Sequence, residues 1–212
     1  MYIPVAFAEQ RLDVLHDFLS SNAFATLVTH GGRGLVATHV PVVLLPARGP
    51  FGTLQFHLAK PNSQCDHLAA GTEALAIFQG PHAYISPTWY ANQAAVPTWN
   101  YIAVHACGTA HVMNDEELVL HLDALVTTYE AGRPNGWDSG KLPGDVTERL
   151  RQAIIGFEMP IARIEGKWKL GQNRTAADRA GAIEGLRSTG TPGDAAIADR
   201  MAATVKSAKL EM

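Results

Sequence analysis

Short apolar segments that end at glycine or proline recur along the first 170 residues. Segments of this kind, rich in β-branched and aromatic residues, are typical of β-strands. Glycine pairs and glycine–proline pairs between them mark turns, as at Gly31-Gly32 and Gly80-Pro81. Pro41 places its strand at a sheet edge or bulge, and Gly108 indicates a bulge or a close backbone approach. The predicted strands are residues 24–29, 35–45, 53–58, 74–78, 82–85, 98–112 and 157–170, the last as one strand or a pair.

Helical spacing of apolar residues interrupts this strand pattern at several places. Leu12, Leu15, Phe18 and Leu19 fall on one face of a predicted helix over 8–21. Further helices are expected at 62–70, after a cap at Asn114 or Asp115, and at 145–155, 175–187 and 194–207.

Runs of strands with helices inserted between hairpins favour antiparallel over doubly wound sheets. We therefore predict a β-barrel with helices, of the mainly β or α+β class. Its expected domains are a barrel over 1–174 and a helical extension over 175–212 that packs on the barrel.

The composition is that of a globular protein. The 212 residues are 47% hydrophobic and 17% charged, with a formal net charge of -3, which gives no overall basic excess for nucleic acid or anionic lipid. No apolar run is long enough to span a bilayer, and the N-terminal residues lack a secretory pattern. We expect a soluble cytoplasmic protein in which Cys65 and Cys107 are buried thiols.

Two segments carry more polar side chains than a core requires. Thr38-His39 on a predicted strand offers a hydroxyl and an imidazole to a planar ligand, and an exposed strand face with a satisfied histidine is the alternative. Residues 60–64 lie where a strand ends and a helix begins, which suits phosphate because unpaired backbone N–H groups point outward there. An ordinary strand-to-helix turn is the alternative.

Two further segments, 80–90 and 96–101, contain tryptophans and tyrosines beside prolines. Aromatic rings in such loops line a pocket for a flat ligand, form a subunit interface or close a barrel end. The nine histidines show no metal-ligand spacing, and no GxSxG motif is present, so neither a metal nor a serine nucleophile is predicted.

The strings ATHVPV, HLAKPN, FQGPHAYISPTWY and VPTWNY occur in this order. With the start MYIPVAF and the later IIGFEMPIARIEGKWKLGQNR, they resemble the PaiB-type family of negative transcriptional regulators, within the FMN-binding split-barrel superfamily. The resemblance runs from Met1 to about Arg179.

The resemblance implies a homodimer that binds FMN at the subunit interface. It places the FMN phosphate at the strand-to-helix junction and the isoalloxazine beside the preceding strand, with contributions from the partner subunit and from the turn after the last strand. The implied residues are Lys60, Asn62 and Gln64 for the phosphate, Thr38, His39 and Val40 for the ring, Trp99 and Asn100 from the partner, and Gln172, Asn173 and Arg174 to close the site.

Three functions remain open on the sequence. The first is an FMN-binding regulator, the second a flavin-dependent oxidoreductase that acts on a small molecule, and the third an interaction domain without flavin. Direct DNA binding is also open. Residues 175–187 and 194–207 have the length of a helix-turn-helix, but the second helix is rich in alanine and its basic residues gather at its end.

Overall fold

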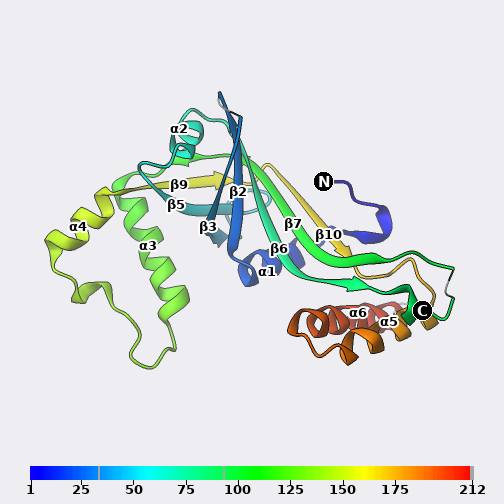
Figure 1. Ribbon diagram of the computed structural model, residues 1–212. Coiled ribbons are helices and arrows are strands. Elements are labelled where there is room, and N and C mark those ends of the chain that lie inside the picture. The colour runs from blue at the N-terminus through cyan, green and yellow to red at the C-terminus, as the bar shows by residue number, and fades with distance from the viewer. Residues whose placement is uncertain (33, 93, 211–212) are drawn as a thin grey trace. The chain divides into compact units, whose positions relative to one another are not determined.

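The computed structural model describes residues 1–32, 34–92 and 94–210. Its strands form two sheets, ordered β1-β10-β7-β6-β2-β3 and β4-β5-β9-β8 (Figure 1). The strand pairs described below are antiparallel. The predicted α+β class is confirmed. The strands are β1 Ala8–Glu9, β2 Phe24–Gly31, β3 Gly34–Pro41, β4 Val43–Leu45, β5 Thr53–Ala59, β6 Glu73–Ile85, β7 Thr98–Thr109, β8 His111–Val112, β9 Ile154–Pro160 and β10 Arg163–Lys169.

Helices are inserted between the strands and follow the last of them. They are α1 Leu12–Ser21, α2 Gln64–Ala69, α3 Asp115–Glu130, α4 Gly144–Gln152, α5 Ala176–Ser188 and α6 Pro192–Leu210, with single turns η1 Val5–Phe7, η2 Pro87–Trp89 and η3 Ser139–Lys141. Among the described residues, no helix combines the length and the apolar run needed to cross a bilayer.

The chain forms two compact units, each built from separate stretches of sequence. The terminal unit comprises Met1–Leu15, Gln79–Val104 and the residues from Glu165 onward, and the central unit comprises His16–Phe78 and His105–Ile164. The predicted boundary at residue 174 stays a prediction, and the last two residues of the predicted extension lie outside the described chain. In the structure, α5 and α6 belong to the terminal unit together with strands from earlier in the chain.

A long hairpin begins the central unit. Strands β2 and β3 pair from Phe24 opposite Pro41 to Gly31 opposite Gly34, which confirms the predicted turn. Pro41 is tolerated because β3 is the last strand of its sheet, as predicted. The chain then enters the second sheet, where β5 pairs with β9 and the rings of Phe56 and Phe157 stack with centroids 5.8 Å apart in the core.

Side-chain caps begin two helices, and the sequence indicated the first of them. Asn114 accepts the Glu117 amide while the Glu117 carboxylate accepts the Asn114 amide, so a complete capping box starts α3. In the terminal unit, the Thr175 hydroxyl accepts the Asp178 amide and starts α5. The predicted close approach at Gly108 is also confirmed, because a Cβ there would lie 2.2 Å from the Pro160 carbonyl oxygen.

Several predicted elements have different bounds in the structure, and the strand expected over 98–112 is divided into β7 and β8. The strands expected at 74–78 and 82–85 are one strand, β6, because an extended backbone accepts the fixed φ of Pro81 without ending the ladder. The segment over 35–45 is divided into β3 and β4 after Pro41. The first helix starts at Leu12 and not at residue 8, since Ala8 and Glu9 pair with β10 as the short strand β1.

The segment that precedes β7 packs against two glycines of α5. A Cβ at Gly181 would lie 2.0 Å from the Trp89 carbonyl oxygen, and a Cβ at Gly185 would lie 2.3 Å from the Trp89 ring. The absence of side chains therefore lets η2 pack directly on the helix backbone. This contact fixes one end of the 86–97 segment on the terminal unit.

We expect Gly181→Ala to lower the free energy of unfolding by about 1–3 kcal/mol, because the new methyl group would overlap backbone. Alanine's higher helix propensity, about 1 kcal/mol, offsets part of this loss. Urea unfolding measures the effect. Gly193→Ala in α6 is the control: its Cβ would make an ordinary 3.7 Å contact, so stability should be unchanged or slightly raised. Equal stability of the two variants would contradict the packing described here.

Candidate functional site

The strand-to-helix junction after β5 is held together by the side chain of Asn62. Its amide donates to the Thr38 hydroxyl at 2.9 Å, and its carbonyl oxygen accepts the Gln64 amide, also at 2.9 Å. The Cys65 amide donates to the Asn62 backbone carbonyl at 3.0 Å. The first two backbone N–H groups of α2, those of Gln64 and Cys65, therefore already have partners. Lys60 is exposed at this junction, and its phosphate role stays a prediction.

Gln64 is fully buried beneath the junction. Its amide nitrogen donates to the carbonyls of Leu27 and Val36 at 3.1 and 3.0 Å, and to the Thr29 hydroxyl at 3.1 Å. Thr29 is itself buried and bonds His67 at 2.9 Å. The Gln64 side-chain oxygen has no hydrogen-bond partner among the described residues. Gln64 therefore ties α2 to both strands of the hairpin.

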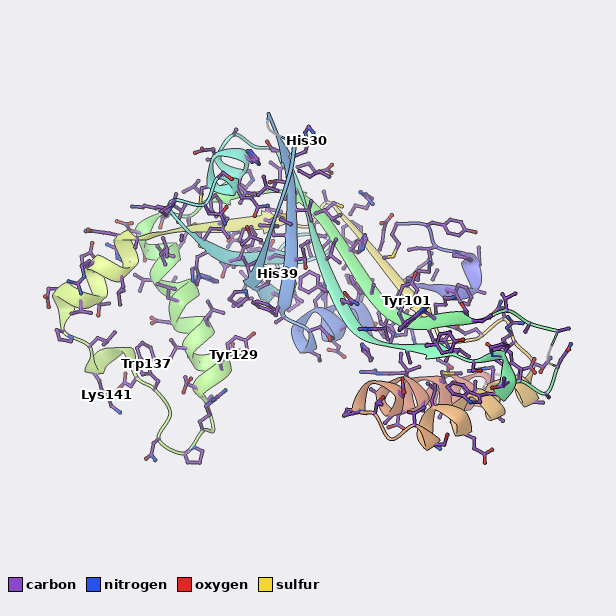
Figure 2. The ribbon with its side chains drawn as sticks, viewed as in Figure 1. His30, His39, Tyr101, Tyr129, Trp137 and Lys141 are labelled. Atoms are coloured by element: carbon purple, nitrogen blue, oxygen red, sulfur yellow. The ribbon has the colours of Figure 1, made fainter. Side chains whose placement is uncertain are left out.

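The three candidate residues on β3 point in two directions. Thr38 and Val40 share one face of the strand, and His39 lies on the other, as strand alternation requires. His39, which Figure 2 labels, bonds the Thr26 hydroxyl at 3.0 Å and stacks on the Phe24 ring at 6.1 Å. Thr38 and His39 therefore do not meet the same ligand from this strand.

In the terminal unit, three exposed rings gather on one face of β6 and β7. The Trp99 ring lies 6.0 Å from His82 and 6.1 Å from Tyr84, and Trp99 is 53% exposed. We call His82, Tyr84 and Trp99 the aromatic cluster. The next residue, Asn100, points to the opposite face, where it is buried and its amide contacts the Met201 sulfur of α6 at 3.3 Å. Trp99 is thus available to a ligand or partner, whereas Asn100 joins the sheet to its helical cover.

The turn after β10 is braced by Gln172. Its carbonyl oxygen accepts the Leu170 amide at 2.8 Å, and its amide donates to the Trp168 carbonyl at 2.6 Å. Gly171 supplies the left-handed conformation that the turn needs, with φ at 75°. Asn173 is exposed. The Arg174 guanidinium lies over the Tyr90 ring, with its carbon 4.9 Å from the ring centroid.

Two lysines come next to this turn, and the sequence analysis did not select them. Lys167 and Lys169 alternate on β10 and so share a face of the strand. The Lys167 ammonium donates to the Tyr2 carbonyl at 3.0 Å and lies 5.2 Å from the centroid of the Tyr101 ring. Tyr101 is labelled in Figure 2. The Lys169 ammonium donates to the Thr98 hydroxyl. The K-x-K alternation within a predicted strand could have identified these two lysines.

The sequence analysis also did not identify a histidine pair in the central unit. His57 on β5 and His121 on α3 form a hydrogen bond of 3.2 Å between Nδ1 of His57 and Nε2 of His121. Burial, and then the neighbouring His57, lowers the pKa of His121 to about 4. Burial also lowers the pKa of His57. Both rings are therefore neutral near pH 7 and hold α3 against the sheet.

An apolar cavity of about 800 Å³ lies between α3, α4 and the segment joining them, where Figure 2 labels Trp137. Its one lining arginine, Arg151, pairs with Glu148 at 2.7 Å and with Asp115 at 2.9 Å, and Asp123 adds a further carboxylate to the lining. An anionic ligand therefore gains little there. The apolar lining comprises Val119, Leu122, Leu125, Val126, Trp137, Leu142, Leu150 and Ile154.

Two solved structures of flavoproteins share this fold. The chain matches the FAD and heme binding protein from Mycobacterium smegmatis with a TM-score of 0.58 and 18% identity, over 82% of this chain and 79% of that one. It matches the flavocytochrome Anf3 from Azotobacter vinelandii with a TM-score of 0.57 and 14% identity, over 76% and 69%. The fold is that of the flavin-binding split-barrel proteins.

Residues 1–163 match the family described as "Putative FMN-binding domain", and the chain belongs to this family. It is also 35% identical over 203 residues to the PaiB protein of Bacillus subtilis, "Protease synthase and sporulation protein PAI 2", covering 95% of this chain and 96% of that protein. The predicted PaiB-type family is confirmed, and the family supports FMN as its cofactor.

The side chains of the terminal unit fit FMN. A flavin presents a flat ring system and, as FMN, a phosphate with a charge between about −1.5 and −2. The aromatic cluster offers exposed rings, and Lys167, Lys169 and Arg174 offer three positive charges on the same unit. At the junction after β5, the neighbouring amides are already bonded and Lys60 is the exposed cation.

Proposed function

We propose that the protein is a homodimeric FMN-binding protein of the PaiB type, with the flavin ring against the aromatic cluster at the dimer interface. The observation that carries the proposal is the exposure of Trp99 and Tyr84, 53% and 44%, in a family of FMN-binding proteins. Large aromatic side chains that remain exposed on one subunit are typical of surfaces covered by a ligand or a partner. Bound FMN would supply the redox chemistry, and the protein would bind and orient it.

The absorbance spectrum of the purified protein, before and after FMN is added, tests this proposal. We expect a yellow protein, and quenching of flavin fluorescence on titration into the apoprotein. Trp99→Ala should weaken the binding of both FMN and riboflavin by about 10-fold or more, because the stacking surface is common to both. A protein that binds neither flavin at micromolar concentration would overturn the proposal.

Homodimer formation is tested separately by light scattering. A symmetric interface would cover the aromatic cluster of both subunits at once. We expect a mass of twice 22.8 kDa at micromolar concentration. A mass of one chain in the presence of saturating FMN would contradict the dimer.

The packing of α5 and α6 favours a flavin-dependent role over direct reading of DNA. Met201 of α6 contacts Asn100, and Gly181 and Gly185 of α5 contact Trp89, so each helix packs one face on its own unit. A recognition helix presents its outer face to the major groove, and the charged side chains described on α6 are Asp194, Asp199 and Arg200, which give no basic excess for DNA phosphates. We therefore keep a flavin-dependent oxidoreductase as the second candidate. Salt-dependent binding to promoter fragments would favour the regulator, because phosphate contacts weaken as salt rises.

A further inference from the structure

The cavity between α3 and α4 has no role in the flavin site proposed above. Its volume, about 800 Å³, lies within the range of about 300–1,000 Å³ that is usual for small-molecule sites. Protein interiors are normally packed closely enough to leave few voids larger than a water molecule. Two of the lining side chains are also unusually open, because Trp137 is 49% exposed and Leu150 is 55% exposed. The cavity is therefore suited to an apolar occupant.

Polar contacts at both ends of α3 hold the walls of the cavity. Arg151, in the last turn of α4, pairs with Asp115, the first residue of α3, at 2.9 Å. The Trp137 amide donates to the carboxylate of Glu130, the last residue of α3, at 2.9 Å. Walls from α3, α4 and the segment that joins them therefore enclose a small volume. Such a volume suits a small molecule better than the flat surface of a protein partner.

The charges around the cavity favour a cation. Among the described residues, Arg151 is the one basic side chain in the lining, and Glu148 and Asp115 both pair with it. Asp123 also lines the cavity, is exposed, and forms no ion pair or hydrogen bond within the described chain. Residues 115–152 carry eight acidic and four basic side chains, a balance of −4 in a chain whose formal charge is −3. The negative charge of the protein is therefore concentrated around this cavity.

Trp137, on the segment that joins α3 and α4 (Figure 2), adds a surface that attracts cations. The electron-rich face of an indole ring binds an organic cation within about 6 Å of its centre. In the described part of the chain, no lysine or arginine lies over the Trp137 ring, whereas Lys167 and Arg174 occupy the faces of tyrosine rings in the terminal unit. The Trp137 ring is thus open to a ligand, in a lining that also contains Asp123.

We propose that this cavity binds a small organic cation with an apolar body, such as a hydrophobic amine in its protonated form. The apolar body would replace water against the leucine, valine and isoleucine side chains of the lining, and the positive charge would lie near Asp123 and the Trp137 ring. A matched anion gains little from Arg151, which already has two carboxylate partners. The site is separate from the aromatic cluster, which belongs to the terminal unit, whereas the cavity belongs to the central unit.

Three probes of similar shape and different charge test the assignment. Pyrenemethylamine is a cation at pH 7, pyrenemethanol is neutral and pyrenecarboxylate is an anion, and pyrene fluorescence gives the free concentration of each probe in equilibrium dialysis. The full-length protein is dialysed against each probe, without and with saturating FMN. We expect the cation to bind about 5- to 20-fold more tightly than the alcohol, and the anion to bind most weakly. FMN should displace none of the probes.

Two variants with matched controls locate the bound probe. Trp137→Ala should raise the Kd for the cation and for the alcohol by about 10-fold, because both lose one wall of the cavity, and should leave the Kd for FMN unchanged. Trp99→Ala, in the aromatic cluster, is its control and should leave the binding of the probes unchanged. Asp123→Asn should raise the Kd for the cation by about 3-fold or more and that for the alcohol by less than about 2-fold. Its control is Asp145→Asn, which replaces an exposed acid of α4 outside the lining and should change neither value.

Stability shows whether these variants report on binding or on folding. Trp137 and Asp123 are both exposed, so Trp137→Ala and Asp123→Asn should keep the melting temperature of the unaltered protein. The cation should raise the melting temperature of the unaltered protein and of Asp145→Asn, and should raise it less in the two lining variants. A melting temperature that the cation raises equally in all four proteins would contradict the site.

Several further results would overturn the assignment. Equal binding of the cation and the anion would mean that the acidic residues do not select the ligand, and binding of no probe would remove the site. Displacement by FMN, or an equal loss of binding in Trp99→Ala, would place the probes at the flavin site. Conversion of dimers into single chains by the cation, seen by light scattering, would make this face an interface between copies of the chain. Failure to bind FMN would overturn the flavin proposal and leave this site standing.

Discussion

Lowering the pH from 6.5 to 4 should remove roughly 3 kcal/mol from the free energy of unfolding through one side chain, His121. The residue is fully buried, and its pKa falls from an ordinary value of 6.5 to about 4 in the folded protein. The unfolded state therefore binds more protons than the folded state between these two values. The resulting loss begins as the pH falls through 6.5 and is complete a little below 4.

The hydrogen bond between the two histidines explains why the neutral ring is preferred. Nε2 of His121 forms a hydrogen bond with His57. The other ring nitrogen of His121, Nδ1, is buried without a hydrogen-bond partner in the described part of the chain. A bare nitrogen lone pair is tolerated there, whereas a proton would create a buried cation with an unsatisfied N–H. Acid should therefore first loosen α3 from the second sheet.

Urea unfolding at pH 7.5 and pH 4.5 measures this effect, with His121→Gln as the variant that removes the titration and keeps a polar group. The difference between the two pH values should be 2–3 kcal/mol smaller in His121→Gln than in the unaltered protein, on the order of the pKa shift. His111→Gln, on an exposed residue of β8, is the control and should behave like the unaltered protein. Parallel pH profiles for all three proteins would refute the role of His121.

Replacing Gln64 by leucine should destabilise the protein by about 2–4 kcal/mol and leave the affinity for flavin nearly unchanged in the protein that remains folded. The leucine side chain has a similar volume but donates nothing to the carbonyls of Leu27 and Val36 or to Thr29. Leu27 and Thr29 are buried and Val36 is half-buried, so water replaces the lost donor poorly, although Thr29 keeps its hydrogen bond to His67.

Gln64 is also one of the residues that the family resemblance assigns to the phosphate, and the same variant decides between the two roles. A structural role predicts a large drop in the urea midpoint with the FMN affinity preserved. A ligand role predicts the reverse, with stability nearly unchanged and FMN binding weakened. Asp66→Ala, an exposed position on the same short helix, should change stability by less than about 1 kcal/mol and serves as the control.

The sequence contained the local signals for most elements. The helix cap at Asn114 or Asp115, the glycine turn at Gly31 and the proline at the edge of β3 were predicted correctly, because each depends on residues that are near one another in the chain. Gly80-Pro81 was misread as a turn, since the same pair also fits an extended strand when neighbouring strands hold it. Whether such a pair forms a turn or continues a strand depends on the neighbouring strands of the sheet, and these strands are distant in sequence.

The candidate site was harder to predict for the same reason. Asn62 and Gln64 have the chemistry of phosphate ligands, and only the hairpin folded over α2 shows that their amides have partners inside the protein. Lys167 was not selected because burial is what makes its charge informative, and burial depends on Tyr2 and Tyr101 from other parts of the chain. Residue type alone does not distinguish a lysine in water from a lysine enclosed by rings.

The pairing of β1 with β10 has a consequence for how the protein matures in the cell. Ala8 lies opposite Lys167, so one of the first strands to be synthesised pairs with one of the last. At 5–20 residues per second, translation of the chain takes on the order of 10–40 s, and for most of that time β1 has no partner. The terminal unit is therefore completed only after β10 and the helices that follow it have been synthesised. If this unit binds FMN, the cofactor binds after that point and does not guide the folding of the earlier strands.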